Sequence, residues 1–313
     1  MAFLGVDLGG TKLTVAAFSE SGHLLSRESV PLATRKSTEV GDLIKTQVAR
    51  HFSKSEIESV GVSVPGISNQ HTGMVWAPNI EGWENFPLMH EVKKVVGDTP
   101  VMIDNDRACC ILGERWQGNA KNCNDAIFIA AGTGISAGII SGGHLIRGHN
   151  DIAGSIGWMA LRKPYDNKYN SCGCLEYHAS GAGIPKFTRE ILASDSRRSI
   201  LRVHSPGEIN AQHVFDAYDA GDPVATNVVH ECISYWGMAA ANLISIFNPE
   251  KVIFGGGVFG AAAKHISAIK TEAAKWAQPV SMKQVQFEQT KLGGDAAVFG
   301  AGFLALTNCN IHS

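Results

Sequence analysis

The chain has 313 residues, of which 44% are hydrophobic and 18% charged, and its formal net charge is −2. This is the composition of a globular protein, and the length permits about two domains. A charge so close to neutral gives no sign of a nucleic-acid-binding surface or of a strongly basic partner. The apolar runs are strand-sized and interrupted by glycine, well short of the roughly 18–20 residues that cross a membrane.

The N-terminus and the cysteines point to a cytoplasmic protein. Residues 1–7 lack a basic region and carry Asp7 directly after the apolar run, so we expect no signal peptide. The seven cysteines are scattered, and their number is odd. Because a chain of this length does not need disulfides to hold its core, we expect reduced thiols.

The first half of the chain predicts a strand, a glycine turn and a return strand. Residues 3–7 and 13–18 are apolar runs on either side of Gly9-Gly10, and together they predict a β-hairpin. The other elements expected here are strands at 23–30, 59–64 (ended by Pro65-Gly66) and 100–104, and helices at 39–52 and 106–117.

The second half repeats this pattern. Residues 125–130 predict a strand, Gly132-Thr133-Gly134 a turn, and 135–140 a return strand. The later elements expected are a long helix at 222–247, stopped by Asn248-Pro249, and a strand at 251–254 that ends in Gly255-Gly256-Gly257. A unit that occurs once in each half indicates a duplication, and βα units in both halves predict a two-lobed α/β protein with a central cleft.

The two glycine turns and the acidic sequence between them indicate phosphoryl transfer. A strand that ends in glycine lets backbone N–H groups approach a phosphate, and Thr11, Lys12 and Thr133 add donors. Asp106, in the sequence Asp104-Asn105-Asp106, is a candidate base that activates a hydroxyl group.

Together these motifs resemble the ROK family of sugar kinases and repressors, in the actin/hexokinase-like superfamily. The resemblance covers nearly the whole chain and implies the two-lobed, actin-like or ribonuclease H-like ATPase fold, with duplicated lobes around a central cleft. The segments that carry it are Asp7–Lys12, Gly61–Gly66, Ala77–Trp83, Asp104–Asp106, Gly132–Gly134, Gly173–Glu176 and Asn248–Gly257.

The resemblance implies a role for each matching residue. Asp106 matches the general base, and Asp7 would hold Mg²⁺ through a water ligand. The residues expected at ATP are Gly9, Gly10, Thr11, Lys12, Gly132, Thr133, Gly134, Gly255, Gly256 and Gly257. Those expected at the sugar are Gly66, Asn79, Asn105, Asp106, Ser155, Trp158 and Glu176.

The resemblance also implies an architecture and partners. Residues 1–110 with about 292–313 would form a small lobe on the sugar and phosphate side. Residues 111–291 would form a large lobe on the nucleotide side. The small residues of 292–302 suit close helix packing. A homodimer is implied, with a sugar as substrate and with no nucleic acid or membrane partner.

The segment Ser155-Ile156-Gly157-Trp158 departs from the family pattern. Family members usually carry Glu and His at the positions of Ser155 and Trp158, and this His binds a structural zinc with three cysteines. Cys174 is retained, but the other two cysteine positions fall at Asn167 and Tyr169. Because zinc requires four N or S ligands, we expect no zinc, although Cys172 and Cys174 with His149 or His178 remain an alternative set.

These substitutions predict two consequences. Packing of the Trp158 indole would replace the metal as the anchor of the loop. Serine in place of a glutamate removes an anionic acceptor near the anomeric carbon, so a substituted or unusual sugar would be preferred over glucose.

Each assignment has a structural alternative. Asp104 and Asp106 would then be a strand end and a helix N-cap, and the glycine pairs plain hairpin turns. Trp76 and Trp83 flank Asn79 and are candidates for stacking on a sugar, but we expect Trp83 to be a core residue.

Three functions compete. A sugar kinase would transfer the γ-phosphate of ATP to a hexose, amino sugar or substituted sugar, with O6 as the expected acceptor. A repressor of the same family would carry a helix-turn-helix before the glycine motif. Because this motif starts at Asp7, we expect no room for such a domain. A sugar sensor without activity would fit the changes at Ser155 and Trp158, but Asp106 and Lys12 argue against it. The sequence leaves open another phosphoryl donor, such as polyphosphate.

Overall fold

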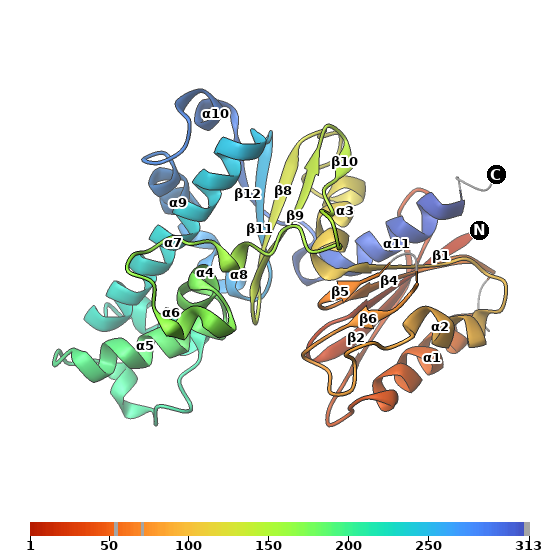
Figure 1. Ribbon diagram of the computed structural model, residues 1–313, viewed down its shortest axis with the longest axis horizontal. Coiled ribbons are helices and arrows are strands. Elements are labelled where there is room, and N and C mark those ends of the chain that lie inside the picture. Colours follow the sequence, from red (N-terminus) through yellow and green to blue (C-terminus); the bar gives the residue numbers. More distant parts are fainter. Residues whose placement is uncertain (53–55, 70–71, 310–313) are drawn as a thin grey trace. The chain divides into compact units, whose positions relative to one another are not determined.

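The computed structural model describes residues 1–52, 56–69 and 72–309, which form two compact units (Figure 1). The first unit holds the described residues of 1–122, 145–153 and 291–309, and the second holds 123–144 and 154–290. The predicted lobe boundary near residue 110 falls inside a helix that this division keeps whole in the first unit. Residues 310–313, at the end of the predicted small lobe, lie outside the described residues.

The first unit is built on a five-stranded sheet in the order β3-β2-β1-β4-β7. Its strands are β1 (Ala2–Leu8), β2 (Lys12–Phe18), β3 (Leu24–Pro31), β4 (Ile57–Val64) and β7 (Val101–Asn105). β2 is antiparallel to β1 and β3, whereas β4 is parallel to β1 and β7 is parallel to β4. The short strands β5 (Ile67–Ser68) and β6 (Val75–Trp76) form a separate pair.

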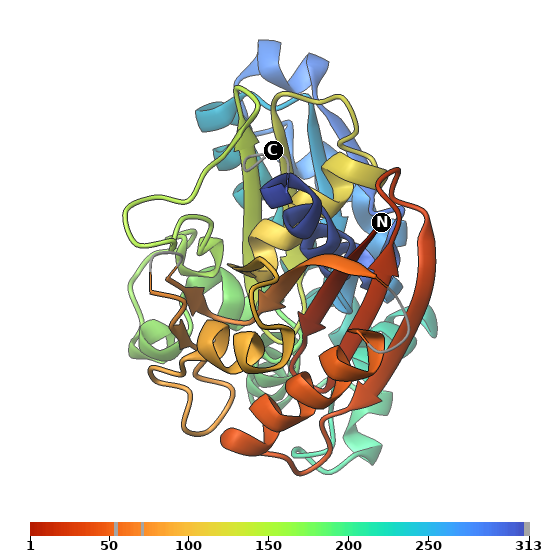
Figure 2. The same ribbon diagram turned by 90° about the vertical axis from the view of Figure 1, so that its right-hand side faces the viewer.

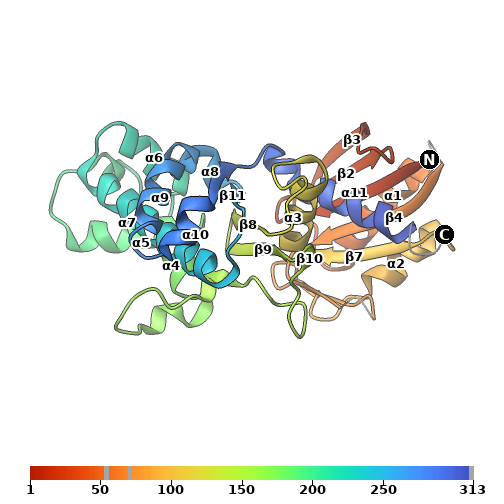
Figure 3. The same ribbon diagram turned by 90° about the horizontal axis from the view of Figure 1, so that it is seen from above.

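Helices cover both faces of this sheet. Leu4, Val6 and Leu8 of β1 share a buried cluster with α1 (Thr38–Phe52) and α2 (Leu88–Val96), which lie together in Figure 2. The alternate side chain Phe3 packs on α11 (Ala296–Cys309), which lies beside α3 (Asp106–Gln117) in Figure 3. Because side chains alternate along a strand, Asp7 faces α3 and α11.

Small residues bring α11 close to the sheet and to α3. A Cβ atom on Gly61 of β4 would overlap the carbonyl oxygen of Ala301, and one on Gly300 would overlap that of Cys109. The close packing predicted for 292–302 is therefore confirmed, and it extends to the α3 helix that begins at Asp106.

The second unit contains a sheet in the order β10-β9-β8-β11-β12. The strands are β8 (Ala126–Ala131), β9 (Ile135–Ser141), β10 (His144–Leu145), β11 (Lys251–Gly255) and β12 (Gln286–Gln289). β8 is antiparallel to β9 and parallel to β11, which is parallel to β12. In the first unit, β1 is likewise antiparallel to β2 and parallel to β4. The two units thus share one strand arrangement, and the predicted duplication is confirmed.

The helices of the second unit lie in the chain between β10 and β11 and between β11 and β12. They are α4 (Cys174–Ala179), α5 (Gly183–Ser194), α6 (Ala211–Asp219), α7 (Pro223–Phe247), α8 (Val258–Ala261), α9 (Ile266–Ala273) and α10 (Pro279–Gln284). α7 begins after Asp222, which accepts hydrogen bonds from the Val224 and Ala225 N–H groups. It ends at Phe247, as predicted, with Asn248 as its C-cap before a proline. In the described part of the chain, no helix is both long and apolar enough to cross a membrane.

Candidate active site

The β1–β2 turn exposes backbone and a lysine at the end of a buried strand. The Gly9 N–H donates to the Lys12 carbonyl at 3.0 Å and closes the turn, while Gly10, Thr11 and Lys12 are exposed. No atom lies within 4 Å of a Cβ placed on Gly10. This geometry leaves the predicted phosphate turn open to an anion.

Asp7 lies beside this turn and is held by a residue that sequence reasoning missed. Ser63 lies next to Asp7 in the parallel register of β1 and β4, and its Oγ donates to Asp7 Oδ1 at 2.8 Å. Burial raises the pKa of Asp7 to about 6, the Ser63 hydrogen bond lowers it, and the charge of Asp106 raises it. Ser63 lies in the Gly61–Gly66 segment that carries the resemblance, but only the strand register shows that it contacts Asp7.

The acidic sequence lies where β7 turns into α3. Asn105 is the N-cap of α3, and its side-chain oxygen accepts from the Ala108 N–H at 2.9 Å. Asp104 is fully buried, accepts from the Asn105 backbone and side-chain N–H groups, and pairs with Arg147 Nη1 at 2.6 Å. The alternative in which Asp106 caps this helix is therefore wrong, because Asn105 does so.

Asp106 is the first residue of α3 and is partly buried. Its Oδ1 accepts from the Arg107 backbone N–H at 2.8 Å. Burial raises the pKa of Asp106 above its ordinary value, and the charge of Arg107 opposes this effect. The charge of Asp106 also raises the pKa of Asp7, which lies in the same unit.

The other predicted residues of the first unit lie in two loops. Gly66 has φ of 94°, and a Cβ there would overlap the carbonyl oxygen of Trp76. Asn79 is exposed. Trp83 is fully buried, donates from Nε1 to the Ser37 carbonyl and stacks on Phe86 at 4.2 Å, so its prediction as a core residue is confirmed.

In the second unit, the Gly132-Thr133-Gly134 turn is tied to the start of α4 and α5. The Gly132 N–H donates to the Gly134 carbonyl at 2.9 Å, and the Gly181 N–H donates to the Gly132 carbonyl at 2.7 Å. Glu176 Oε2 accepts from the Ile135 N–H at 2.8 Å, just after the turn. A Cβ on Gly134 would lie 2.5 Å from the same oxygen, so Glu176 and this turn constrain each other.

The Gly255-Gly256-Gly257 run lies against this turn. Gly256 has φ of 87°, and a Cβ there would overlap the Ala131 carbonyl oxygen. A Cβ on Gly255 would overlap Phe128, whereas one on Gly257 would meet no atom within 4 Å. The chain's own packing thus requires glycine at 255 and 256, and only Gly257 leaves its space open.

The Trp158 prediction is wrong in one respect. Its indole is 58% exposed at the end of a 3₁₀ turn, Ile156–Trp158, and so it does not anchor the loop in a core. The anchor is instead an aromatic cluster around His178. Tyr169, at an expected cysteine position, is buried and hydrogen bonds through its hydroxyl group to His178 Nε2 at 3.0 Å.

This aromatic cluster is unlike a zinc site. The His178 ring stacks on Tyr235 with a centroid distance of 4.4 Å, and burial lowers the pKa of His178 to about 4. The Cys232 thiol donates to the His178 carbonyl. Across residues 1–52, 56–69 and 72–309, no three His, Cys, Asp or Glu side chains gather as a metal site would require. The residues present therefore do not fit a structural zinc.

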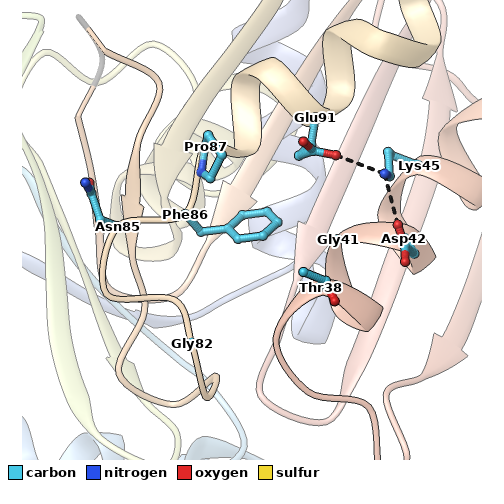
Figure 4. A pocket seen from close by; sticks show the side chains of 9 residues that line it. All are labelled: Thr38, Gly41, Asp42, Lys45, Gly82, Asn85, Phe86, Pro87 and Glu91. Atoms are coloured by element: carbon cyan, nitrogen blue, oxygen red, sulfur yellow. Dashed lines mark hydrogen bonds and ion pairs between the residues drawn. The ribbon is translucent and has the colours of Figure 1, made fainter.

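A separate hollow of about 420 Å³ lies between α1, α2 and the loop before α2 (Figure 4). Lys45 at its side pairs with both Asp42 and Glu91 at 2.9 Å. None of the nine lining residues is a predicted site residue. Because Lys45 is already paired, we assign no ligand to this hollow.

Comparison with known proteins defines the class of this chain. A model of the ROK family matches residues 3–308, and the chain belongs to this family. A glucokinase from Halalkalibacterium halodurans is 34% identical over 316 residues, which cover 96% of this chain and 94% of that protein. A glucokinase from Thermotoga maritima is 30% identical over 308 residues, which cover 96% of this chain and 96% of that protein.

A solved structure extends the comparison. A ROK family glucokinase from Streptomyces griseus, in complex with glucose and AMPPNP, is similar with a TM-score of 0.81 and 30% identity, covering 98% of this chain and all of that one (100%). These similarities confirm the predicted actin-like ATPase fold and the predicted enzyme class, a carbohydrate kinase.

Proposed function

We propose that the protein transfers the γ-phosphate of ATP to a primary hydroxyl group of a sugar, O6 of a hexose, amino sugar or substituted sugar. The observations that carry this proposal are the open glycine turn after Asp7 and the effect of the Asp106 charge on Asp7, in a chain whose relatives include glucokinases. Asp106 and Asp7 supply a candidate base and a candidate cation-binding carboxylate within one unit.

Asp106 acts as the general base in this proposal. As the sugar oxygen bonds to the γ-phosphorus, the bond from that phosphorus to the departing ADP oxygen breaks, and the hydroxyl proton passes to Asp106. A base works best when its pKa is near the working pH, and burial raises the pKa of Asp106 in that direction.

Asp7 is the proposed Mg²⁺ site, through a water ligand. A partly buried carboxylate with a raised pKa beside a second carboxylate fits a cation, which would relieve both effects. When bound, Mg²⁺ neutralises phosphate charge that would otherwise repel Asp106. The Ser63 hydrogen bond holds the Asp7 carboxylate in one orientation.

The glycine turns are proposed to bind the nucleotide. Gly9 to Lys12 and Gly132 to Gly134 would border the phosphates with backbone N–H groups. Gly255 to Gly257 would border the adenosine, with the open space at Gly257 the natural place for it. The first unit would therefore carry the sugar and the reacting phosphate, and the second unit the nucleotide.

The sugar is proposed to contact Gly66, Asn79, Asn105, Ser155, Trp158 and Glu176. Glu176 keeps one carboxylate oxygen on the Ile135 N–H, and its other oxygen remains for a hydroxyl group. The exposed indole of Trp158 offers an apolar face to a sugar ring. With Ser155 in place of an anionic acceptor, a substituted sugar should compete well with glucose.

The test is ADP release with ATP and Mg²⁺ across a panel of hexoses, amino sugars and β-glycosides, with NMR to identify the phosphorylated oxygen. We expect release only with sugar, phosphate on O6, and a substituted sugar ahead of glucose in kcat/KM. Sugar binding without ADP release would instead identify a sensor, and glucose far ahead would refute the proposed specificity. We also propose a homodimer, which sedimentation of the same sample would test.

A further inference from the structure

Arg107, the residue after the proposed base, holds two irregular loops of the first unit. It is only 7% exposed. Its Nε donates to the Ala153 carbonyl at 2.9 Å, Nη1 to the Gly66 carbonyl at 3.3 Å, and Nη2 to the Asp151 carbonyl. We propose that Arg107 is a positioning residue that fixes the Gly66 turn and the 151–153 segment beside Asp106.

The two loops have little regular structure of their own. Gly66 has φ of 94° and Asp151 has φ of 56°, so both acceptors belong to left-handed backbone that no strand or helix stabilises. Buried carbonyl groups in such segments require donors from elsewhere. Arg107 supplies three of them from a single side chain.

These loops lead to the proposed sugar contacts. Gly66 is itself one of them, and Ala153 precedes Ser155 by two residues. On the other side of Arg107, its backbone N–H donates to Asp106 Oδ1. Arg107 therefore links Asp106 to the Gly66 turn and to the 151–153 segment. This inference rests on the proposed function.

The role of Arg147 overlaps with that of Arg107 only in part. Arg147 pairs with Asp104, whose other oxygen orients Asn105. It also lies in the 145–153 segment, and its carbonyl accepts from the Ala153 N–H at 3.0 Å. Its guanidinium group lies 3.8 Å from the Asp151 carboxylate. Arg147 thus supports the N-cap of α3 and contributes to the 151–153 segment, whereas Arg107 joins that segment to the Gly66 turn.

Only arginine suits this arrangement. The guanidinium group presents five N–H donors in a rigid plane, which lets it reach three carbonyl groups at once. A lysine keeps the charge but has one compact ammonium group. The positive charge of Arg107 also opposes the rise in the pKa of Asp106 that burial causes. Asp7 and the thiol of Cys110 are titratable groups that also interact with Asp106.

The experiment compares Arg107→Gln and Arg107→Lys by steady-state kinetics on the full chain, with the best sugar of the panel. For Arg107→Gln we expect kcat/KM for the sugar to fall about 100-fold, because small displacements of positioned groups have effects of this size. Arg107→Lys should recover part of kcat but keep a raised KM for the sugar. The KM for ATP should change less than about twofold in both variants.

Arg202→Gln is the matched control. Arg202 makes a similar set of carbonyl contacts in the second unit, to Arg197 and Leu192, and it is exposed. We expect wild-type kinetics from it. Thermal unfolding of all three variants shows whether each is folded, and Arg107→Lys decides the question if Arg107→Gln does not fold.

Two results would overturn the inference. One is wild-type KM and kcat in Arg107→Gln. The other is an equal loss of sugar and ATP affinity in both variants, which marks a merely structural role. An active Asp106→Asn enzyme would instead refute the proposed base, so the two failures can be told apart.

Discussion

The two units build the same strand–turn–strand element and equip it differently. In the first unit, Asp7 is the penultimate residue of β1, and a second carboxylate, Asp106, follows β7. In the second unit, the matching strand β8 ends in Ala131 and leads into Gly132-Thr133-Gly134, where a neighbouring glycine run packs against the turn. The first copy has a carboxylate in the strand before its turn, whereas the carboxylate at the second turn, Glu176, comes from α4.

This difference shows how the two copies of a duplicated unit can take different roles in one reaction. Interacting carboxylates with raised pKa values suit proton transfer and cation binding. The Gly132-Thr133-Gly134 turn has no acidic residue of its own, and the Glu176 carboxylate beside it already accepts a hydrogen bond from the Ile135 N–H. The backbone of such a turn suits a phosphate chain. The predictions below separate these two tasks, beginning with the largest effect.

Asp106→Asn should lower kcat by about 10²–10⁴, because the amide cannot accept the hydroxyl proton. The measurement is sugar-dependent ADP release at saturating substrates. Asp98→Asn, an exposed aspartate before β7, is the control and should be normal. A near-normal rate for Asp106→Asn would place the base elsewhere.

Gly256→Ala should raise the KM for ATP by about 10–100-fold, because its Cβ displaces the backbone of Ala131 next to the phosphate turn. Gly257→Ala should also raise this KM, although its Cβ meets no protein atom, because the space is proposed to hold adenosine. Gly260→Ala is the matched control, with similar open space in α8. An unchanged KM in Gly257→Ala would remove this residue from the nucleotide site.

Asp7→Asn should remove activity and yet stabilise the protein. Because the pKa of Asp7 is raised from 3.8 to about 6 on folding, the folded chain holds this proton more tightly than the unfolded chain. Stability from this group is therefore present below pH 3.8 and is lost as pH rises through 6. At pH 8 without Mg²⁺, Asp7→Asn should gain about 1–3 kcal/mol in unfolding free energy.

The gain in Asp7→Asn should shrink as the pH falls toward 4 and when Mg²⁺ is added to the wild type. Urea unfolding at several pH values measures it, with Asp98→Asn as the control for a lost surface charge. A variant that is less stable than the wild type at pH 8 would show that the Ser63 hydrogen bond outweighs the burial of the charge.

The smallest effect concerns the aromatic cluster. Tyr169→Phe removes the hydrogen bond to His178 and should lower the unfolding free energy by about 1 kcal/mol. Tyr165→Phe, on an exposed side chain, should change it less. A chelator should leave the melting temperature of the wild type unchanged, whereas one stoichiometric zinc per chain would contradict the aromatic anchor.

Local sequence patterns were enough to predict both hairpins, their turns and the duplication, but they did not predict the short strands β5, β6, β10 and β12. Apolar runs of strand length ending in glycine or proline gave β1, β2, β4, β8 and β9 within a few residues. The Asn248-Pro249 stop gave the end of α7. The close packing of α11 followed from its small residues.

The contacts between distant polar groups could not be predicted in the same way. Ser63 meets Asp7 only through the register of β1 and β4, and Arg107 reaches loops 41 and 46 residues away in the sequence. Trp158 is exposed, and the buried contact in this region is instead the hydrogen bond between Tyr169 and His178. Such contacts are fixed by the tertiary fold rather than by any local period.

The division of labour is tested most directly by titrating a non-hydrolysable ATP analogue, with Mg²⁺, into Asp106→Asn and Gly256→Ala by calorimetry. We predict a wild-type Kd for Asp106→Asn, although its turnover is lost, and a Kd weakened at least about tenfold for Gly256→Ala. Weakened binding in Asp106→Asn together with unchanged binding in Gly256→Ala would contradict the account.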